Sequence, residues 1–482
     1  MVIRGGVWPT GSGSLFPLDQ LQYMALVRET GHLHHVLDHF PMFLISGLGF
    51  RAGLDVRLAF LLWVPVAAVV MVWGFGLYVR TLLPTHGAQT VALVLALFYL
   101  SPFVALLAWT KYDQGDSFAH LVFTSYYLFP AGSLWGYPQI AITLGLMPIC
   151  LLYALPGAEP RRSALAPIAG ALISFLHPWQ GVTVLVIHAI TAATSAAART
   201  KILLITLLAT GAPLAYYRLA SASDPRLELT DRNTLLATAP LWVVLAALAP
   251  LLIAFAGIDG KRLDTLRERQ LVIWPLVSLL CYWRVDVSWQ PYFLLGTTLP
   301  LAILAVRGAN RISAMRRTSI AVFAVAAVTI PGVVFATNFL RQREYGEARQ
   351  LYALKSADAR ALDYVEHQKR PGSVLGSGFL APAAWAFTGR TSWAATPLVS
   401  PEYTVGKAEA AKLFEGRISA RGSRRFVART DATFVVQGCD EPVRDLATRL
   451  GPLLRAEHRV GCATVYELKR ASSAPSSTPN SR

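Results

Sequence analysis

The chain has 482 residues, of which 54% are hydrophobic and only 15% are charged. A soluble globular domain carries about 25% charged residues, so this composition excludes an ordinary soluble protein and indicates an integral membrane protein. The formal net charge of +16 would suggest nucleic-acid binding on a soluble protein. Here the basic residues stand in short loops between apolar segments, which the positive-inside rule explains, so we expect no nucleic-acid partner.

Residues 1–56 are polar and semi-amphipathic, without the apolar core of a signal peptide. We expect an extracytoplasmic loop with interfacial helices, because the apolar run 40–50 is too short to span a bilayer. Such a loop has to cross the membrane, so we also expect a first transmembrane helix upstream of this start.

Residues 57–340 form the predicted transmembrane domain, with about ten apolar runs. A bilayer core needs about 20 residues of helix, so the runs 164–176 and 271–283 are short. Short or broken spans usually line a cavity, because irregular backbone at membrane depth must be shielded from lipid. The runs are 58–79, 88–109, 138–155, 164–176, 180–197, 202–219, 237–256, 271–283, 291–306 and 320–340.

The loops between these runs differ in charge. One set of loops carries thirteen Lys and Arg residues and four acidic residues, whereas the other set carries four Lys and Arg residues and six acidic residues. This asymmetry predicts a multi-pass protein of the plasma (cytoplasmic) membrane, with residues 1–56 and the C-terminal part on the extracytoplasmic side.

Residues 341–470 predict a small extracytoplasmic α/β domain, followed by a disordered Ser/Pro/Thr-rich tail over 471–482. Cys439 and Cys462 would form a disulfide if this side is oxidising and they lie close together, which the sequence leaves open. The expected strands are 373–375, 425–428, 433–436 and 463–468, and the expected helices are 341–370, 405–414 and 442–454.

The segment 16–29 predicts a helix that carries Asp19, Gln22 and Tyr23. Asp19 and Tyr23 share one face at i and i+4, with Gln22 beside them. A carboxylate there would act as a general base or bind a divalent cation. The alternative is structural, because Asp19 followed by Gln22 three residues later is a capping-box pattern.

The run His177-Pro-Trp-Gln-Gly181 forms the turn of a helical hairpin at the extracytoplasmic end. The turn needs Pro and Gly, but not His177, Trp179 and Gln180, and polar groups at a shielded membrane boundary are candidates for function. Trp135 and Tyr137, beside Gly and Pro, suit stacking on a sugar ring; the alternative is an ordinary interfacial belt of aromatic residues. Arg284 would pair with a phosphate; the alternative is a simple ion pair between Arg284 and Asp286.

Two further groups carry weaker signals. The histidines at 32, 34, 35 and 39 do not share one helix face, so we do not expect a metal site there. The Gly/Pro/aromatic segments 387–393 and 400–403 either overhang a membrane site or are ordinary loops.

Four runs carry a resemblance to a known class: Leu18-Asp-Gln-Leu-Gln-Tyr23, Leu176-His-Pro-Trp-Gln-Gly181, Phe387-Thr-Gly-Arg390 and Gly461-Cys-Ala-Thr-Val-Tyr-Glu467. With this layout the chain resembles the GT-C membrane glycosyltransferases and, more closely, an actinobacterial-type family of polytopic membrane proteins. The resemblance implies a polyprenyl-phosphate sugar donor, a catalytic acid in the first outside loop, which would be Asp19, and often a divalent cation such as Mg²⁺ or Mn²⁺. The chain departs from the class by lacking a helix before that loop and by having a lone Asp-Gln instead of paired acids.

We therefore expect transfer of a sugar from a polyprenyl-phosphate donor to a cell-envelope acceptor on the extracytoplasmic side. Asp19 is the expected catalytic residue, and the expected substrate-binding residues are Gln22, Tyr23, Trp135, His177, Trp179, Gln180 and Arg284. The alternatives are a transporter of lipid-linked sugars or envelope lipids, and a non-catalytic envelope assembly protein that binds such lipids through Trp135 and Trp179.

Overall fold

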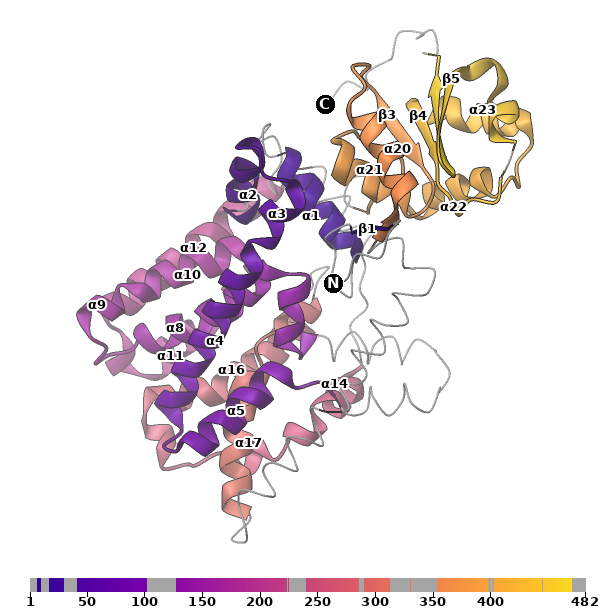
Figure 1. Cartoon of the computed structure of the whole chain (residues 1–482). Coiled ribbons are helices and arrows are strands. Elements are labelled where there is room, and N and C mark those ends of the chain that lie inside the picture. The colour runs from indigo at the N-terminus through magenta and orange to yellow at the C-terminus, as the bar shows by residue number, and fades with distance from the viewer. Residues whose placement is uncertain are drawn as a thin grey trace.

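A computed structural model shows a helical bundle beside a small α/β domain, with helix α1 (Pro17–Glu29) between them (Figure 1). The structure describes residues 7–9, 17–29, 41–101, 127–222, 224, 240–285, 290–312, 330, 353–397, 400, 403–443 and 445–469.

The helices of the bundle follow the apolar runs of the sequence. They are α2 (Pro41–Arg51), α3 (Val56–Leu61), α4 (Trp63–Leu82), α5 (His86–Phe98), η2 (Pro130–Trp135), α8 (Pro138–Tyr153), α9 (Pro160–Ser163), α10 (Leu165–Leu176), α11 (Pro178–Thr194), η3 (Ala196–Ala198), α12 (Lys201–Ser221), α14 (Leu241–Leu248), η4 (Ala249–Leu251), α15 (Ala254–Gly257), η5 (Arg262–Asp264), α16 (Leu266–Arg284), η6 (Gln290–Leu294) and α17 (Thr298–Ile312).

Within the described residues, three helical stretches are long and apolar enough to cross a membrane: Val56–Leu82, Lys201–Ala220 and Gln290–Arg311. Shorter apolar helices accompany them, so this part of the chain is mainly helical, and three of its helical stretches have the length and composition of membrane spans. The count of about ten spans stays a prediction, and the run 320–340 lies outside the described residues except for Ile330.

The expected span 88–109 is wrong in extending past residue 98. Helix α5 ends at Phe98 because Tyr99 adopts an extended backbone, with φ −62° and ψ 117°. The hydroxyl of Tyr99 donates a hydrogen bond of 2.5 Å to the carbonyl oxygen of Ala247, which holds this break inside the bundle.

Helices α4 and α8 pack with their backbones in contact. A Cβ atom at Gly74 would clash with the carbonyl oxygen of Gly145, and one at Gly145 would clash with the backbone of Val70. Small residues permit such close approach, which stabilises helix pairs where lipid offers no hydrophobic driving force. This contact holds the middle of α8, whose first residue, Pro138, follows Tyr137.

A buried ion pair joins three helices at the other end of the bundle. Both guanidinium Nη atoms of Arg307 bond the carboxylate of Glu268, at 2.6 and 2.8 Å, and Nη2 also bonds the carbonyl oxygen of Leu82 at 2.7 Å. The side chains of Arg307 and Glu268 are 9% and 13% exposed. The expected spans 271–283 and 291–306 left both charges in the loops beside them, which is wrong, because α16 contains Glu268 and α17 contains Arg307.

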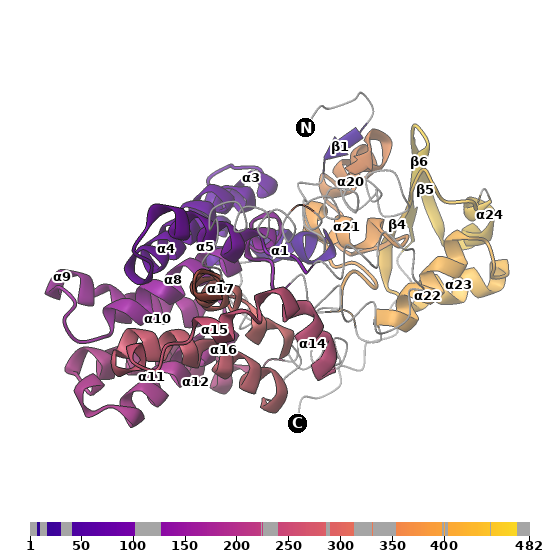
Figure 2. The same ribbon diagram turned by 90° about the horizontal axis from the view of Figure 1, so that it is seen from below.

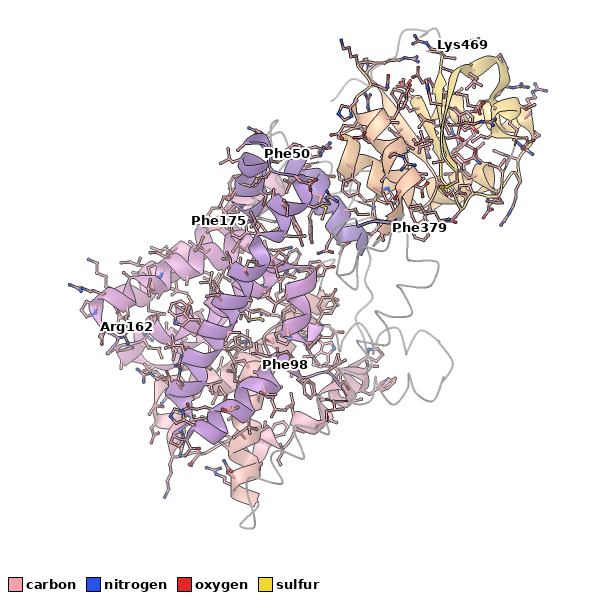
Figure 3. The ribbon with its side chains drawn as sticks, in the orientation of Figure 1. Phe50, Phe98, Arg162, Phe175, Phe379 and Lys469 are labelled. Carbon is pink, nitrogen blue, oxygen red and sulfur yellow. A yellow bond between two sulfur atoms is a disulfide. The ribbon has the colours of Figure 1, made fainter. Side chains whose placement is uncertain are left out.

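Figure 3 shows which end of the bundle lies toward the α/β domain. Arg162, in the basic loop between α8 and α10, lies at the end of the bundle away from the α/β domain, whereas Phe175, near the other end of α10, lies toward it. The basic segment around Arg162, expected inside, and the C-terminal domain, expected outside, are thus at opposite ends. The membrane orientation itself stays a prediction.

The C-terminal domain contains a four-stranded sheet of order β3-β4-β6-β5, with β3 parallel to β4 and the other pairs antiparallel. A separate two-stranded sheet pairs β1 with β2, so a segment near the N-terminus joins the start of this domain. The elements are β1 (Val7–Pro9), β2 (Ala353–Lys355), α20 (Ser356–Glu366), β3 (Ser373–Gly376), α21 (Leu380–Thr388), α22 (Tyr403–Phe414), α23 (Ala420–Arg429), β4 (Ala432–Gln437), α24 (Leu446–Leu450), η7 (Gly451–Leu453), β5 (Leu454–Val460) and β6 (Ala463–Leu468).

Four expectations for this domain need correction. The segment 425–428 is helical, because Ser419 caps α23 and Phe426 and Val427 form its buried face. Helix α24 is shorter than expected, and the residues after it form β5, which was not predicted. Helix α21 was not predicted and ends inside the expected loop segment 387–393. The expected helix 341–370 is wrong over 353–355, which form strand β2 before helix α20 begins. The predicted strands β3, β4 and β6 and the helix α22 are confirmed.

The sheet separates two cores. Phe434 and Val436 of β4 face the larger core, whereas Val435 between them faces a smaller core under α22 and α23. The larger core continues through α20 and α21 to α1 and on into the bundle. Figure 2 shows α1 between the two parts from a second direction. The domain therefore packs on the bundle through α1.

Cys439 and Cys462 form a disulfide, with their Cα atoms 4.9 Å apart. The strands β4 and β6 are hydrogen-bonded neighbours, which brings the residues flanking them together. The pairing that the sequence left open is thereby confirmed. Cys150 and Cys281 are buried and free, as expected of packing residues.

Candidate functional site

The candidate site begins on α1 with Asp19. The helix starts at Pro17, so Asp19 lies inside its first turn and does not hold the N-cap position. Its carboxylate instead accepts a hydrogen bond from the hydroxyl of Tyr137. The capping-box interpretation of Asp19 and Gln22 is therefore wrong, and the acid is oriented by the helical bundle.

Tyr137 is held at the junction of η2 and α8. It is the N-cap residue of α8, and Pro138 at the first helical position fixes the chain there because proline needs no backbone donor. The ring of Tyr23 contacts the ring of Tyr137 edge-on at 6.0 Å between centroids. Tyr23 also packs against Phe43 at 5.4 Å and Phe60 at 6.1 Å. Aromatic rings thus line one side of the Asp19 carboxylate.

The surroundings of Asp19 change its acidity. Burial raises the pKa of Asp19 to about 6, and the hydrogen bond from Tyr137 opposes this rise. Burial first, and the negative charge of Asp19 second, raise the pKa of Tyr127 and of Tyr403. Tyr403 begins α22, so the C-terminal domain contributes a phenol within electrostatic reach of the acid. The two expectations for 400–403, an overhang of the site and an ordinary loop, stay predictions, because residues 401–402 lie outside the described part.

His177, Trp179 and Tyr292 form an aromatic cluster at the start of α11. The centroid distances are 5.1 Å between His177 and Trp179, 4.8 Å between His177 and Tyr292, and 5.2 Å between Trp179 and Tyr292. The amide nitrogen of Gln180 donates a 2.6 Å hydrogen bond to the backbone oxygen of Tyr292. Helix α11 and the η6 turn are thereby tied together.

Tyr127 joins this cluster to Asp19. Its ring meets the ring of Tyr292 edge-on, with centroids 5.2 Å apart, and it lies within the field of the Asp19 carboxylate. Asp19, Tyr23, His177, Trp179 and Gln180, which are far apart in the sequence, therefore belong to one neighbourhood. His177 and Gln180 are buried, whereas Trp179 is half-buried and can meet a ligand.

Three expected site residues are not joined to this neighbourhood by the structure. Gln22 is half-buried on α1. Arg284 is the exposed last residue of α16, and among the described contacts none links it to Asp19 or His177. The backbone of Trp135 ends η2 next to Tyr137, but its side chain lies outside the described part of the chain.

A divalent cation does not fit the described part of this site. Mg²⁺ takes octahedral oxygen ligands, usually including one or two carboxylates. Around Asp19 the described residues supply one carboxylate with aromatic neighbours. The histidines at 32–39 and the acids Asp113 and Asp116 lie outside the described residues. The described chain contains one cluster of three metal-ligating residues, Asp363, Glu366 and His367, which is exposed on α20.

Two tyrosines of the site, Tyr127 and Tyr292, were missed by the sequence interpretation, which considered Tyr137 only as a ring for stacking on a sugar. Tyr127, Tyr137 and Tyr292 come from separate connecting segments, and aromatic residues at membrane boundaries are common. The Gly-Tyr-Pro run at 136–138 carried one usable signal, because proline after Tyr137 marks a helix start.

Comparison with known proteins yields distant structural matches. No family model and no curated protein matches the chain. It is similar to structures of an oligosaccharyltransferase from Archaeoglobus fulgidus, one bound to Zn and sulfate (13% identity, TM-score 0.47, 90% of this chain and 65% of that chain). A second structure has an inhibitory peptide and a dolichol-phosphate (12% identity, TM-score 0.46, 90% of this chain and 67% of that chain). A third has a tethered acceptor peptide (12% identity, TM-score 0.49, 91% of this chain and 66% of that chain).

This chain spans about two thirds of the length of those proteins, and 65% of the first. All three structural matches have identities of 12–13% and TM-scores below 0.5.

Proposed function

We propose that the chain is a GT-C-type glycosyltransferase that moves a sugar from a polyprenyl-phosphate donor to a cell-envelope acceptor on the extracytoplasmic side. The observation that carries this proposal is the Asp19 carboxylate, held by the hydroxyl of Tyr137 in an aromatic surrounding. A base works best when its pKa lies near the operating pH, and the pKa of Asp19 is raised to about 6.

In this reaction Asp19 takes the proton of an acceptor hydroxyl as its oxygen attacks the anomeric carbon of the sugar. The bond between that carbon and the phosphate oxygen breaks, and polyprenyl phosphate leaves with the electron pair. The Tyr137 bond uses Oδ2 of Asp19, so Oδ1 can face the acceptor. Trp179 and Tyr292 offer aromatic faces for a sugar ring or for isoprenoid methyl groups.

The extracytoplasmic placement has independent support in the disulfide of the C-terminal domain. Disulfides persist in oxidising compartments and are rare in the cytosol. Tyr403 of the same domain lies near Asp19, so the active site would open on the side where envelope acceptors are found.

A second candidate function is binding of lipid-linked sugars without catalysis. The cluster of His177, Trp179 and Tyr292 supports it, because stacked aromatic rings can hold a sugar whether or not Asp19 reacts. In this case Asp19 would only orient Tyr137.

The experiment is a transfer assay with purified full-length protein, a radiolabelled polyprenyl-phosphate sugar and an envelope extract as acceptor. We expect Asp19→Asn to lower transfer by a factor of about 10²–10⁴, the usual contribution of a general base, while donor binding remains. Transfer by the variant at the wild-type rate would contradict the catalytic proposal. Binding without transfer by the wild-type protein would favour the second candidate.

A further inference from the structure

The C-terminal end of α1 is fastened to the C-terminal domain. The indole nitrogen of Trp385 on α21 donates a 2.7 Å hydrogen bond to Oε1 of Glu29. Arg28 pairs with Glu366 of α20 at 2.5 Å. Trp385 is 2% exposed, so its donor would be left buried and unpaired without Glu29, which is costly in an apolar interior.

Asp19 lies at the opposite end of the same helix. Ten residues separate it from Glu29, which corresponds to about 15 Å of helix. The residues between are buried against both neighbours, with Leu21, Met24 and Val27 at 0% exposure. Because a packed helix moves as a rigid rod, its position at Glu29 fixes its position at Asp19.

The contacts on the domain side are themselves fixed by the Phe387-Thr-Gly-Arg390 motif. The guanidinium group of Arg390 donates to the carbonyl oxygens of Val365, Gln368 and Arg370, at 3.1, 2.5 and 2.7 Å. These oxygens stand at and just after the end of α20, next to Glu366. Arg390 follows α21, so it holds the α20 and α21 contacts in one geometry.

Gly389 completes this arrangement. It ends α21 with a left-handed backbone, φ +65°, which favours glycine. A Cβ atom there would stand 3.4 Å from Nη1 of Arg28. Arg28 therefore passes beside the end of α21 on its way to Glu366.

We infer that these contacts form a positioning clamp, defined as Arg28, Glu29, Glu366, Trp385 and Arg390, through which the C-terminal domain sets the place of Asp19 against Tyr137. None of the five residues touches Asp19. Only the expected effect of the clamp on sugar transfer rests on the proposed function. The clamp itself concerns the position of α1 and does not depend on that function.

The test is hydrogen–deuterium exchange of the α1 amides in the full-length protein. Trp385→Phe keeps an aromatic ring and removes the donor to Glu29. Losing a hydrogen bond to a charged group should make exchange about tenfold faster along α1, as far as Asp19. Glu29→Ala should have the same effect, and Glu29→Gln, which keeps an acceptor oxygen, should restore most of the protection.

Trp393→Phe is the matched control. Trp393 lies in the same domain and its indole nitrogen has no hydrogen-bond partner among the described residues, so its loss should leave α1 exchange unchanged. Equal α1 exchange in Trp385→Phe and wild type would overturn the clamp, whatever happens to transfer. Faster exchange in Trp385→Phe together with full transfer by Asp19→Asn would uphold the clamp and reject the proposed catalytic role.

Discussion

The hydroxyl of Tyr137 donates a hydrogen bond to the carboxylate of Asp19, although 118 positions separate the two residues. The bond joins α1, which lies outside the predicted spans, to the start of α8, which is a predicted membrane helix. It gives the acid a fixed direction and a partner that favours its charged form, while burial favours the neutral form. The site therefore depends on how α1 is seated on the bundle.

Replacing Asp19 should change how stability depends on pH. The pKa of Asp19 is raised on folding, to about 6, so its contribution to stability is fully present below the unfolded value and is lost as the pH rises through about 6. Asp19→Asn keeps an acceptor for Tyr137 but cannot ionise. Thermal unfolding in detergent should show a smaller fall in midpoint between pH 4.5 and pH 7.5 for the variant than for wild type. Parallel pH curves would argue against burial of the carboxylate.

Removing the ring of Trp179 should weaken substrate binding more than turnover. Trp179 is the half-buried member of the aromatic cluster with His177 and Tyr292. We expect Trp179→Ala to raise KM for the lipid-linked donor roughly tenfold, with kcat changed little, since aromatic contacts contribute about 0.5–1.5 kcal/mol beyond their buried area. Trp73→Ala is a suitable control, because Trp73 on α4 is 47% exposed on the outside of the bundle. Equal KM values for the two variants would remove Trp179 from the site.

Breaking the Arg307–Glu268 pair should destabilise the bundle. Removing one partner of a buried ion pair leaves an uncompensated charge and costs about 3–5 kcal/mol. Glu268→Gln and Arg307→Met should each lower the thermal midpoint, and the double variant should lose less than the sum of the two. Additive losses would mean that the two charges do not interact in the folded protein.

Reducing the disulfide should affect the C-terminal domain alone. Cys439 and Cys462 close a loop over a sequence separation of 23, and the chain-entropy model gives about 3 kcal/mol for a loop of this size. Limited proteolysis after reduction should cut first within residues 353–469. A domain equally resistant with and without reductant would show that the bond contributes little.

The apolar runs of the sequence predicted most of the bundle because hydrophobic length is a direct signal of membrane helices. Local patterns failed where packing across the chain decided the outcome. Phe426 and Val427 resemble a short strand, yet Ser419 caps a helix there and turns both side chains into the core. Asp19 had the composition of a cap, and only its place inside α1 excludes that role.

The candidate site was predictable in part. Asp19 and the His177–Gln180 run were selected from the sequence because they break a simple pattern of helix or hairpin, and their roles stay predictions. Tyr127 and Tyr292 could not be found this way, because their roles depend on contacts between segments distant in the sequence. The expectation for Arg284 stays a prediction, since among the described contacts none joins it to Asp19 or His177.

The most direct test of the role of Asp19 is the pH dependence of kcat/KM for sugar transfer in the wild-type protein and in Tyr137→Phe. If Asp19 is the base, the wild-type rate should fall about tenfold for each pH unit below its pKa of about 6. Tyr137→Phe removes a hydrogen bond that lowers this pKa, so the acidic limb should move to higher pH. A wild-type rate that does not change between pH 5 and pH 8, or an acidic limb that stays in place in Tyr137→Phe, would contradict the catalytic role of the Asp19–Tyr137 pair.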